Sequence, residues 1–315
     1  MKVGVIGAGA VGSACLLSLV LRGSAREIVV LNRTRKRAKA VATDMQYGAS
    51  LSSVVNINDG DYSDLAGASL VMITSGTNEK TGGATDRNDP SGRLRLLDTN
   101  VDVYNEILPQ LFQAAPETVV LVLTDPPDPL ADLVRRFGFK RVLSSGTFLD
   151  SLRFQFHLAR HLNVDPAYVE AQVVGEHGTS EVLLWSSARV AGASIFRALT
   201  QNSLNHEKLR QTVEHEVRYA NITIIEGNQA SQFGIGMAAA RIAEMVLRDE
   251  RAVIPIGSFN PKYEVTLSLP SVVGREGVLQ IMEPEMSEPE RQALERSAET
   301  LRKALARIEL QGAHI

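Results

Sequence analysis

Short apolar runs alternate with amphipathic helical patterns through the first half of the chain. Segments 12–22 and 34–48 have helical periodicity and lie between apolar, β-branched-rich runs. Strands that alternate with helices predict βαβ units and a parallel sheet, so we expect an α/β, doubly wound domain here. The runs expected to be strands are Lys2–Ile6, Glu27–Leu31, Leu70–Thr74, Val119–Leu123 and, more weakly, Arg141–Ser144.

The second half is less regular and predicts a mixed α+β domain. The domain boundary is expected near Gly146–Asp150, which gives domains 1–148 and 149–315. Segment 76–92, rich in glycine and charge, is expected to be a long loop of the kind that often closes over a site. The expected strands are 169–174, 182–185 and a smaller antiparallel set at 253–256, 265–269 and 278–281; the expected helices are 207–226, 236–248 and 284–308.

Composition restricts the function classes. The chain has 315 residues, 44% hydrophobic and 22% charged, with a net charge of −3, so no nucleic-acid or membrane partner is expected. Cys15 is the single cysteine, which excludes an intramolecular disulfide and a four-cysteine zinc site, and no metal is predicted. Glycines interrupt the apolar N-terminal run, which favours a strand and helix over a signal peptide, and we expect a cytoplasmic protein.

A glycine-rich motif, G-A-G-A-V-G, follows the first strand and opens the first helix. Gly7 permits a tight turn, Gly9 lets the backbone approach a pyrophosphate, and Gly12 lets helix and strand pack closely. The free N–H groups at the helix start favour phosphate. This context predicts a Rossmann domain that binds a dinucleotide, with Val11 as a further contact.

The end of the second strand bears on the choice between NAD and NADP. NAD-selective sites usually place an acidic residue there, whereas this chain has Asn32, followed by Arg33 and Arg35. Either arginine can pair with a 2′-phosphate. NADP acceptance is one expectation; the alternative is that both arginines are solvated and NAD binds through Asn32.

Three fragments together resemble the L-lactate/L-malate dehydrogenase superfamily, most closely bacterial L-lactate dehydrogenases. They are the glycine motif, G-T-F-L-D-S-L-R at 146–153 and G-E-H-G at 175–178. The resemblance implies that His177 donates a proton, Asp150 holds its other ring nitrogen, and Arg153 clamps a substrate carboxylate. It thus implies hydride transfer between NAD(P)H and a small 2-oxo acid or L-2-hydroxy acid. Gly76 and Asn100 complete the cofactor-binding candidates.

A second arginine of this superfamily polarises the substrate carbonyl from a mobile loop. Arg93 is the first candidate because R-L-R-L-L-D-T-N at 93–100 matches the family pattern from its arginine onward. The loop before it is longer than usual, and N-D-P-S-G-R at 88–93 resembles the extended loop of L-2-hydroxyisocaproate dehydrogenases. Arg87 is the alternative.

Several substrate-binding positions depart from the family pattern. Glu79 stands where lactate enzymes have Gln and malate enzymes have Arg, so it should repel a dicarboxylate and favour a polar or cationic side chain; alternatively, the long loop carries it out to solvent. Asp125 replaces an asparagine and, when ionised, can only accept hydrogen bonds. Ser231 replaces a pocket threonine.

Two other functions are compatible with the same sequence features. One is a reductase of a bulkier or nitrogen-bearing 2-oxo acid or imine; another is a catalytically silent dinucleotide-binding regulator. The resemblance also implies a homodimer or homotetramer. Gln155 and Glu170 stand where fructose-1,6-bisphosphate-activated relatives carry basic residues, so no activation by that compound is expected.

Overall fold

A nine-stranded sheet forms the centre of the molecule, in the order β14-β13-β12-β6-β5-β4-β1-β2-β3. The computed structural model describes residues 1–52, 54–89 and 91–310, so Pro90 of the loop motif lies outside the described residues. Strands β1 to β6 pair with one another in parallel, which confirms the predicted doubly wound domain. These strands are β1 (Lys2–Ile6), β2 (Glu27–Leu31), β3 (Asn56–Asp59), β4 (Leu70–Ile73), β5 (Val119–Val122) and β6 (Val142–Ser144).

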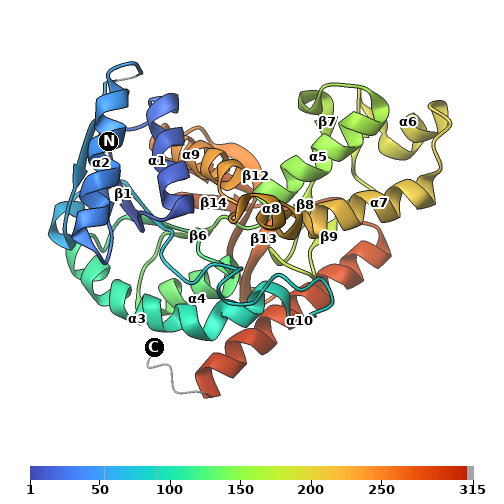
Figure 1. Cartoon of the computed structure of the whole chain (residues 1–315). Coiled ribbons are helices and arrows are strands. Elements are labelled where there is room, and N and C mark those ends of the chain that lie inside the picture. The colour runs from blue at the N-terminus through green and yellow to red at the C-terminus, as the bar shows by residue number, and fades with distance from the viewer. Residues whose placement is uncertain (53, 90, 311–315) are drawn as a thin grey trace.

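Helices cover both faces of this sheet (Figure 1). Side chains of one strand alternate between the two cores: Val71 and Ile73 of β4 face one, and Leu70 and Met72 face the other. The first core is closed by α3 (Leu97–Ala114), α4 (Pro127–Phe137) and α10 (Glu288–Leu310); the second is closed by α1 (Ala10–Arg22), α2 (Arg35–Ala49) and α9 (Phe233–Leu247).

The expected small antiparallel set is not a separate sheet. Strands β12 (Ala252–Asn260), β13 (Val265–Gly274) and β14 (Gly277–Ile281) extend the main sheet, because β12 pairs antiparallel with β6 at Gly257 and Ser144. A side chain at Gly257 would collide with Ser144, so glycine permits this close approach. The predicted antiparallel pairing of these strands is therefore confirmed, and their attachment to the main sheet is an addition that the sequence analysis did not predict.

The remaining elements depart from the expected bounds in small ways. The expected helix 207–226 breaks at Tyr219, and the expected strand 169–174 is two short strands. The helices are α5 (Phe148–Leu162), α6 (Ile195–Gln201), α7 (His206–Arg218) and α8 (Ala220–Asn228), with 3₁₀ turns η1 (Tyr62–Leu65), η2 (Gly92–Leu96) and η3 (Pro166–Tyr168). The short strands are β7 (Val169–Glu170), β8 (Val173–Val174), β9 (Val182–Leu183), β10 (Arg189–Val190) and β11 (Ala193–Ser194).

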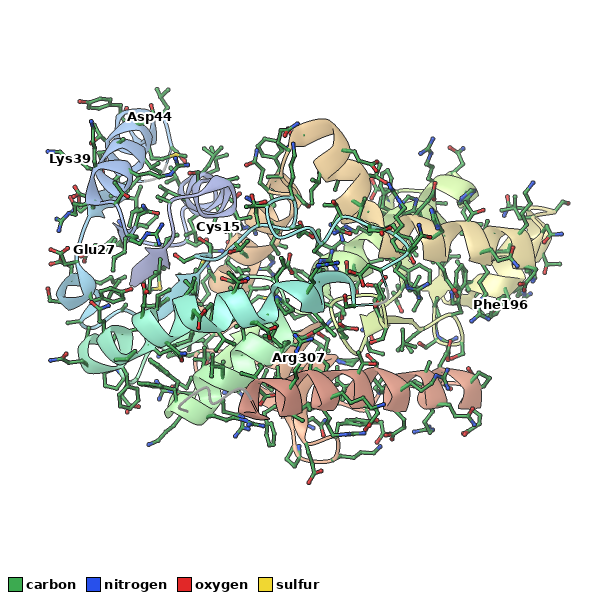
Figure 2. The ribbon with its side chains drawn as sticks, turned by 60° about the horizontal axis from the view of Figure 1, so that its bottom comes forward. Cys15, Glu27, Lys39, Asp44, Phe196 and Arg307 are labelled. Atoms are coloured by element: carbon green, nitrogen blue, oxygen red, sulfur yellow. The ribbon has the colours of Figure 1, made fainter. Side chains whose placement is uncertain are left out.

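Helix α10 ties the end of the described chain to the first domain. Arg307 is a side chain of α10 (Figure 2). It donates to the backbone carbonyl of Leu94, in η2, and forms an ion pair with Asp98 at the start of α3. These contacts brace the segment that carries Arg93. None of the described helices is both long and apolar enough to span a bilayer. The boundary at residue 148 stays a prediction.

Candidate active site

The glycine motif forms an open cradle between β1 and α1. Gly7 has a φ of +114°, a conformation that favours glycine, and a Cβ on Gly12 would lie 1.8 Å from the carbonyl oxygen of Gly7. In contrast, a Cβ on Gly9 would meet no atom within 4 Å, so the N-terminus of α1 faces open space. The cradle therefore fits a pyrophosphate of a dinucleotide, as the sequence predicts.

Residues at the end of β2 support the cradle, and they decide which arginine is free to pair with a 2′-phosphate of NADP. The Asn32 side-chain oxygen accepts a hydrogen bond of 3.1 Å from the backbone N–H of Ala8, inside the cradle. Arg35 forms ion pairs with Asp59 and Asp61, so it is not free to meet a 2′-phosphate. Arg33 is exposed and makes no ion pair with any residue that the structure describes, which leaves it as the candidate.

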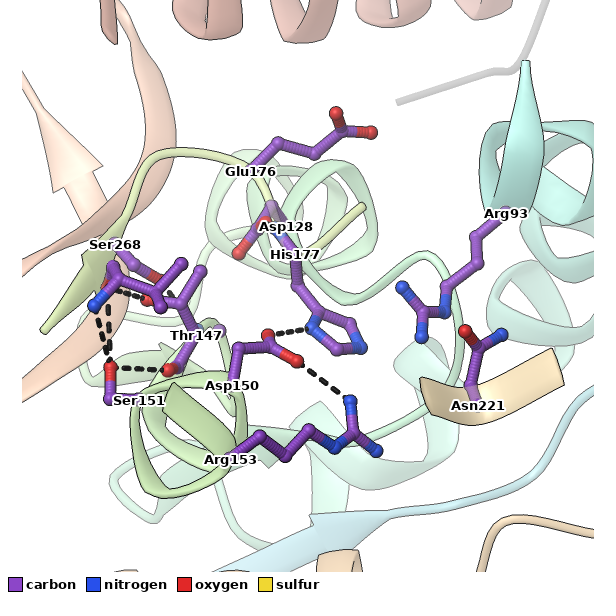
Figure 3. Close-up of polar contacts among 12 residues, drawn as sticks. Arg93, Asp128, Thr147, Asp150, Ser151, Arg153, Glu176, His177, Asn221 and Ser268 are labelled. Atoms are coloured by element: carbon purple, nitrogen blue, oxygen red, sulfur yellow. Dashed lines mark hydrogen bonds and ion pairs between the residues drawn. The ribbon is translucent and has the colours of Figure 1, made fainter. Parts of the chain in front are cut away.

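The three predicted catalytic residues of the second domain meet at one point (Figure 3). Asp150 and Arg153 lie one turn apart on α5, and His177 follows β8. One Asp150 oxygen lies 2.5 Å from His177 Nδ1, and the other accepts a 2.8 Å hydrogen bond from Arg153 Nη1. The single carboxylate therefore orients both the imidazole and the guanidinium.

The charges of this group set its protonation. Burial opposes ionisation of Asp150, but the charges of His177, Arg153 and Arg93 outweigh it and lower the pKa of the carboxyl. Because Asp150 is ionised, His177 Nδ1 carries the hydrogen and Nε2 is left for other chemistry. Burial and Arg93 work against the imidazolium, yet Asp150 and Asp125 outweigh them and raise the pKa of His177.

Asp128 is a buried carboxylate that our sequence analysis did not single out. Its Oδ2 accepts a 2.8 Å hydrogen bond from the backbone N–H of His177, and its Oδ1 accepts from the Ser144 hydroxyl. Burial raises the pKa of Asp128 to about 7, although both hydrogen bonds oppose the rise. It thus fixes the backbone from which His177 projects. The proline-rich turn at 124–129 is the only sequence signal that could have pointed to it.

The opposite wall of the site carries Arg93, Glu79 and Asn221. Arg93 is 7% exposed and Glu79 is 8% exposed, and Arg93 Nε donates to Glu79 Oε1 over 3.1 Å. The amide of Asn221, on α8, donates to the same oxygen over 2.6 Å. Glu79 therefore points inward, and the alternative that the long loop carries it to solvent is wrong. Sequence patterns gave no sign of Asn221, because the contact joins segments 142 residues apart.

Asp125 lies between the two walls. Its carboxylate oxygens lie 3.6 Å from Arg93 Nε and 3.8 Å from His177 Nε2. Burial and the nearby charge of Glu79 raise the pKa of Asp125, while Arg93 and His177 hold the rise back. Asp125 therefore places a titratable carboxyl beside His177 Nε2, where an asparagine would place a neutral amide.

The two candidate loop arginines have separate surroundings. Arg87 forms ion pairs with Glu226 and donates to Thr223, both on α8 and outside the cavity. Lys80 hydrogen-bonds Gln229 just beyond the same helix. Loop 76–92 is thus fastened onto α8, with Arg93 inside and Arg87 on the outer surface.

A cavity of about 210 Å³ connects the cradle to the catalytic residues. Asn100 lies behind its wall, where its side chain accepts from the Thr77 N–H and donates to the Asp125 carbonyl, so any effect on a cofactor would be indirect. The predicted site residues that line the cavity are Gly9, Val11, Gly76, Glu79, Arg93, Asp125, Arg153, His177 and Ser231. A dinucleotide and a small acid can therefore meet in one continuous space.

Comparisons with known proteins identify the family to which the chain is similar. Residues 1–141 match the family model described as lactate/malate dehydrogenase, NAD binding domain, and residues 147–311 match its alpha/beta C-terminal domain. The chain is 44% identical to an L-lactate dehydrogenase of Deinococcus radiodurans over 304 residues, with 96% of this chain and 97% of that protein covered. It is 41% identical to an L-lactate dehydrogenase of Thermus aquaticus, with 98% and 99% covered.

Solved structures agree with these matches. A lactate dehydrogenase from a Medee basin deep-sea metagenome library superposes with a TM-score of 0.88 at 30% identity, covering 97% of this chain and 98% of that one. A minor L-lactate dehydrogenase from Enterococcus mundtii gives a TM-score of 0.89 at 28% identity, with 98% of each chain covered.

The fold and the site together define a dehydrogenase with an NAD-binding domain. The chain belongs to the lactate/malate dehydrogenase family. It is a lactate dehydrogenase-like oxidoreductase of the 2-hydroxyacid dehydrogenase class, which confirms the activity class expected from its sequence motifs.

Proposed function

We propose that the protein interconverts a small 2-oxo monocarboxylic acid and its L-2-hydroxy acid. The observation that carries this proposal is the Asp150–His177 pair beside Arg153, in the cavity that also reaches the glycine cradle. A bound nicotinamide supplies the hydride in such chemistry. A pure dinucleotide sensor has no need of a proton donor and a carboxylate clamp in one space.

Each residue of the site has a separate task in this proposal. His177 donates a proton from Nε2 to the developing alkoxide, and ionised Asp150 stabilises the imidazolium. Arg153 holds the substrate carboxylate through guanidinium hydrogen bonds. Arg93 takes the role of the loop arginine, with its Nη groups directed to the carbonyl oxygen as negative charge grows there. Arg87 is proposed to hold the loop against α8 and to make no contact with the substrate.

The substrate is proposed to carry one carboxylate. Glu79 and Asp125 bring two acidic groups to the cavity, and a second carboxylate on the substrate would be repelled by Glu79. Oxaloacetate should therefore be a poor substrate. A reductase of a nitrogen-bearing 2-oxo acid or an imine is the second candidate, since Asp125 offers an acceptor 3.8 Å from His177 Nε2.

NADP is proposed to be accepted beside NAD. Support comes from uncharged Asn32, which cannot repel a 2′-phosphate, and from exposed Arg33, which can pair with one. Arg35 is excluded from this role by its two aspartate partners. Steady-state rates with NADH and NADPH decide this point, and the lack of turnover with NADPH under conditions where NADH supports it would overturn the proposal.

Self-association is proposed through helices α1 and α9, which pack side by side. Their outer face leaves large apolar side chains exposed, an arrangement typical of a subunit interface. These side chains are Leu17, Leu21, Phe233 and Met237. Light scattering should give the mass of a dimer or a tetramer, whereas a monomer would overturn this assignment.

A cytoplasmic location and the lack of fructose-1,6-bisphosphate activation stay predictions.

The experiment that tests the function is a panel of 2-oxo acids with each reduced cofactor, followed by absorbance of NADH or NADPH. The panel contains pyruvate, oxaloacetate, branched and aromatic 2-oxo acids, and one amino-bearing 2-oxo acid. We expect turnover of monocarboxylates and little of oxaloacetate. Activity confined to the amino-bearing acid would favour the second candidate. Tight cofactor binding without turnover of any acid would instead indicate a silent regulator.

A further inference from the structure

Glu79 presents one unused carboxylate oxygen to the cavity. Its Oε1 accepts from both Arg93 and Asn221, whereas its Oε2 accepts no hydrogen bond from any residue that the structure describes. The Glu79 side chain is 10% exposed and lines the cavity. A hydrogen bond to an ionised oxygen is stronger than one between neutral groups, so a group that enters the cavity and supplies a donor to Glu79 Oε2 is favoured.

Asn221 keeps this oxygen available. The Asn221 side chain lies beside the Arg93 guanidinium (Figure 3), and its amide holds Glu79 Oε1 over 2.6 Å. An amide is a neutral donor, so it orients the carboxylate without cancelling its charge. Without Asn221, the carboxylate could rotate about its own axis and exchange its two oxygens between Arg93 and the cavity. Asn221 is therefore a positioning residue for Glu79.

The neighbouring cations do not occupy Oε2. Arg93 binds through Nε to Oε1, and Lys80, next to Glu79 in sequence, is held by Gln229 at α8. Arg93 offsets part of the negative charge of Glu79, so a neutral donor suits the remaining oxygen better than an ammonium group placed close to Arg93. A hydroxyl is the smallest such donor.

We infer that Glu79 and Asn221 form an acceptor subsite that selects 2-oxo acids with a hydroxyl group on the third carbon. The inference rests on the proposed function, in which Arg153 and Arg93 hold the carboxylate and the carbonyl. The third carbon then lies against the wall that Glu79 provides, and its hydroxyl donates to Glu79 Oε2. An apolar substituent of the same size would leave that oxygen without a partner.

The test compares 3-hydroxypyruvate with 2-oxobutanoate, which differ by a hydroxyl in place of a methyl group. The measured quantity is the ratio of kcat/KM for the two acids within one protein, because general damage to a variant cancels in that ratio. Glu79→Met removes the acceptor and should lower the ratio about ten- to a hundredfold, the range for hydrogen bonds to charged groups. Asn221→Leu should lower it by a smaller factor, because the carboxylate remains but is no longer oriented.

Two further variants complete the design. Glu106→Gln, an exposed charge removal on α3, is the matched control and should leave the ratio unchanged. Glu79→Gln replaces the free oxygen with a donor of the same shape, so turnover of oxaloacetate relative to pyruvate should rise. An unchanged hydroxypyruvate ratio in Glu79→Met overturns the inference, while continued reduction of both acids would leave the proposed function standing.

A binding measurement keeps the inference testable if these variants do not fold. Calorimetry on the wild-type protein with NADH, which cannot exchange a hydride with a hydroxy acid, compares L-glycerate with L-2-hydroxybutanoate, the hydroxy-acid counterparts of the two substrates. Tighter binding of L-glycerate, by about tenfold or more, supports the acceptor subsite. Equal binding overturns it. Failure of both acids to bind, together with no turnover of any 2-oxo acid, would overturn the proposed function as well.

Discussion

The two walls of the cavity are built in different ways. Asp150 and Arg153 project from α5, and His177 follows β8. Asp150 is hydrogen-bonded to both of the other side chains, so the three form one connected group. The opposite wall consists of Glu79 and Arg93, from loop 76–92 and the turn after it, and of Asn221 on α8. Hydrogen bonds from Arg93 and Asn221 to Glu79 hold these separate segments together. In the proposed function, the first wall supplies a proton and an anchor for the carboxylate of any 2-oxo acid. The second wall is proposed to face the part of the substrate that distinguishes one acid from another.

The first wall is expected to show the largest effect of mutation. His177→Gln keeps the size and polarity of the side chain but removes the group that exchanges a proton near neutral pH. A positioned general acid contributes about 10²–10⁴-fold, so kcat should fall by that factor. Stopped-flow or steady-state rates with the best panel substrate measure it.

His161→Gln on α5 is the matched control, because His161 is exposed and lies outside the cavity. It should retain wild-type turnover. If His177→Gln kept a rate within a few-fold of wild type, the proton would come from another group, and Asp125 beside Nε2 would be the first candidate to examine.

The second prediction separates the inner and outer arginines of the other wall. Arg93→Gln removes a buried donor directed at the growing charge of the carbonyl oxygen, and kcat should fall about 10²–10³-fold. Arg87→Gln loses only exposed contacts to α8, so kcat should change little and any effect should appear in KM as the loop opens more readily. Parallel kinetics on the two variants make the comparison.

A larger loss of kcat in Arg87→Gln than in Arg93→Gln would reverse the assignment. It would mean that the loop changes position when substrate binds and brings Arg87 into the cavity. The glutamine substitution is the same in both variants, so each serves as the control for the other.

The same contrast explains what could be predicted from sequence. The parallel strands and the glycine cradle follow from local periodicity and spacing, since their partners lie within one βαβ unit. The Asp150–Arg153 pair came from the family resemblance of the 146–153 motif, and its i,i+3 spacing on one helix agrees with a shared cleft. The attachment of β12 to β6 and the contact of Asn221 with Glu79 join segments more than a hundred residues apart. Such contacts leave no periodic trace, so neither the extended sheet nor the inward position of Glu79 could be read from the pattern.

The smallest effect is expected where the two walls interact, at Asp125. The raised pKa of His177 means that the imidazolium persists to higher pH than in an ordinary histidine, so the reduction rate should be retained below the raised pKa and fall as pH rises through it. Oxidation of the hydroxy acid needs neutral imidazole and should show the opposite limb, with the rate lost as pH falls through the same value. Profiles of kcat/KM in both directions measure that value.

Asp125→Asn tests how far the second wall controls the first. The substitution removes a carboxylate 3.8 Å from His177 Nε2, and that carboxylate is one of the groups that raise the pKa of His177. Both pH limbs should therefore move to lower pH, while the rate on the plateau changes less than in the arginine and histidine variants. Asp150 still holds Nδ1 in this variant, so the imidazole keeps its orientation. Limbs that stay in place would show that Asp125 is protonated over the working range, in which case it acts on the substrate as a neutral donor and the two walls titrate independently.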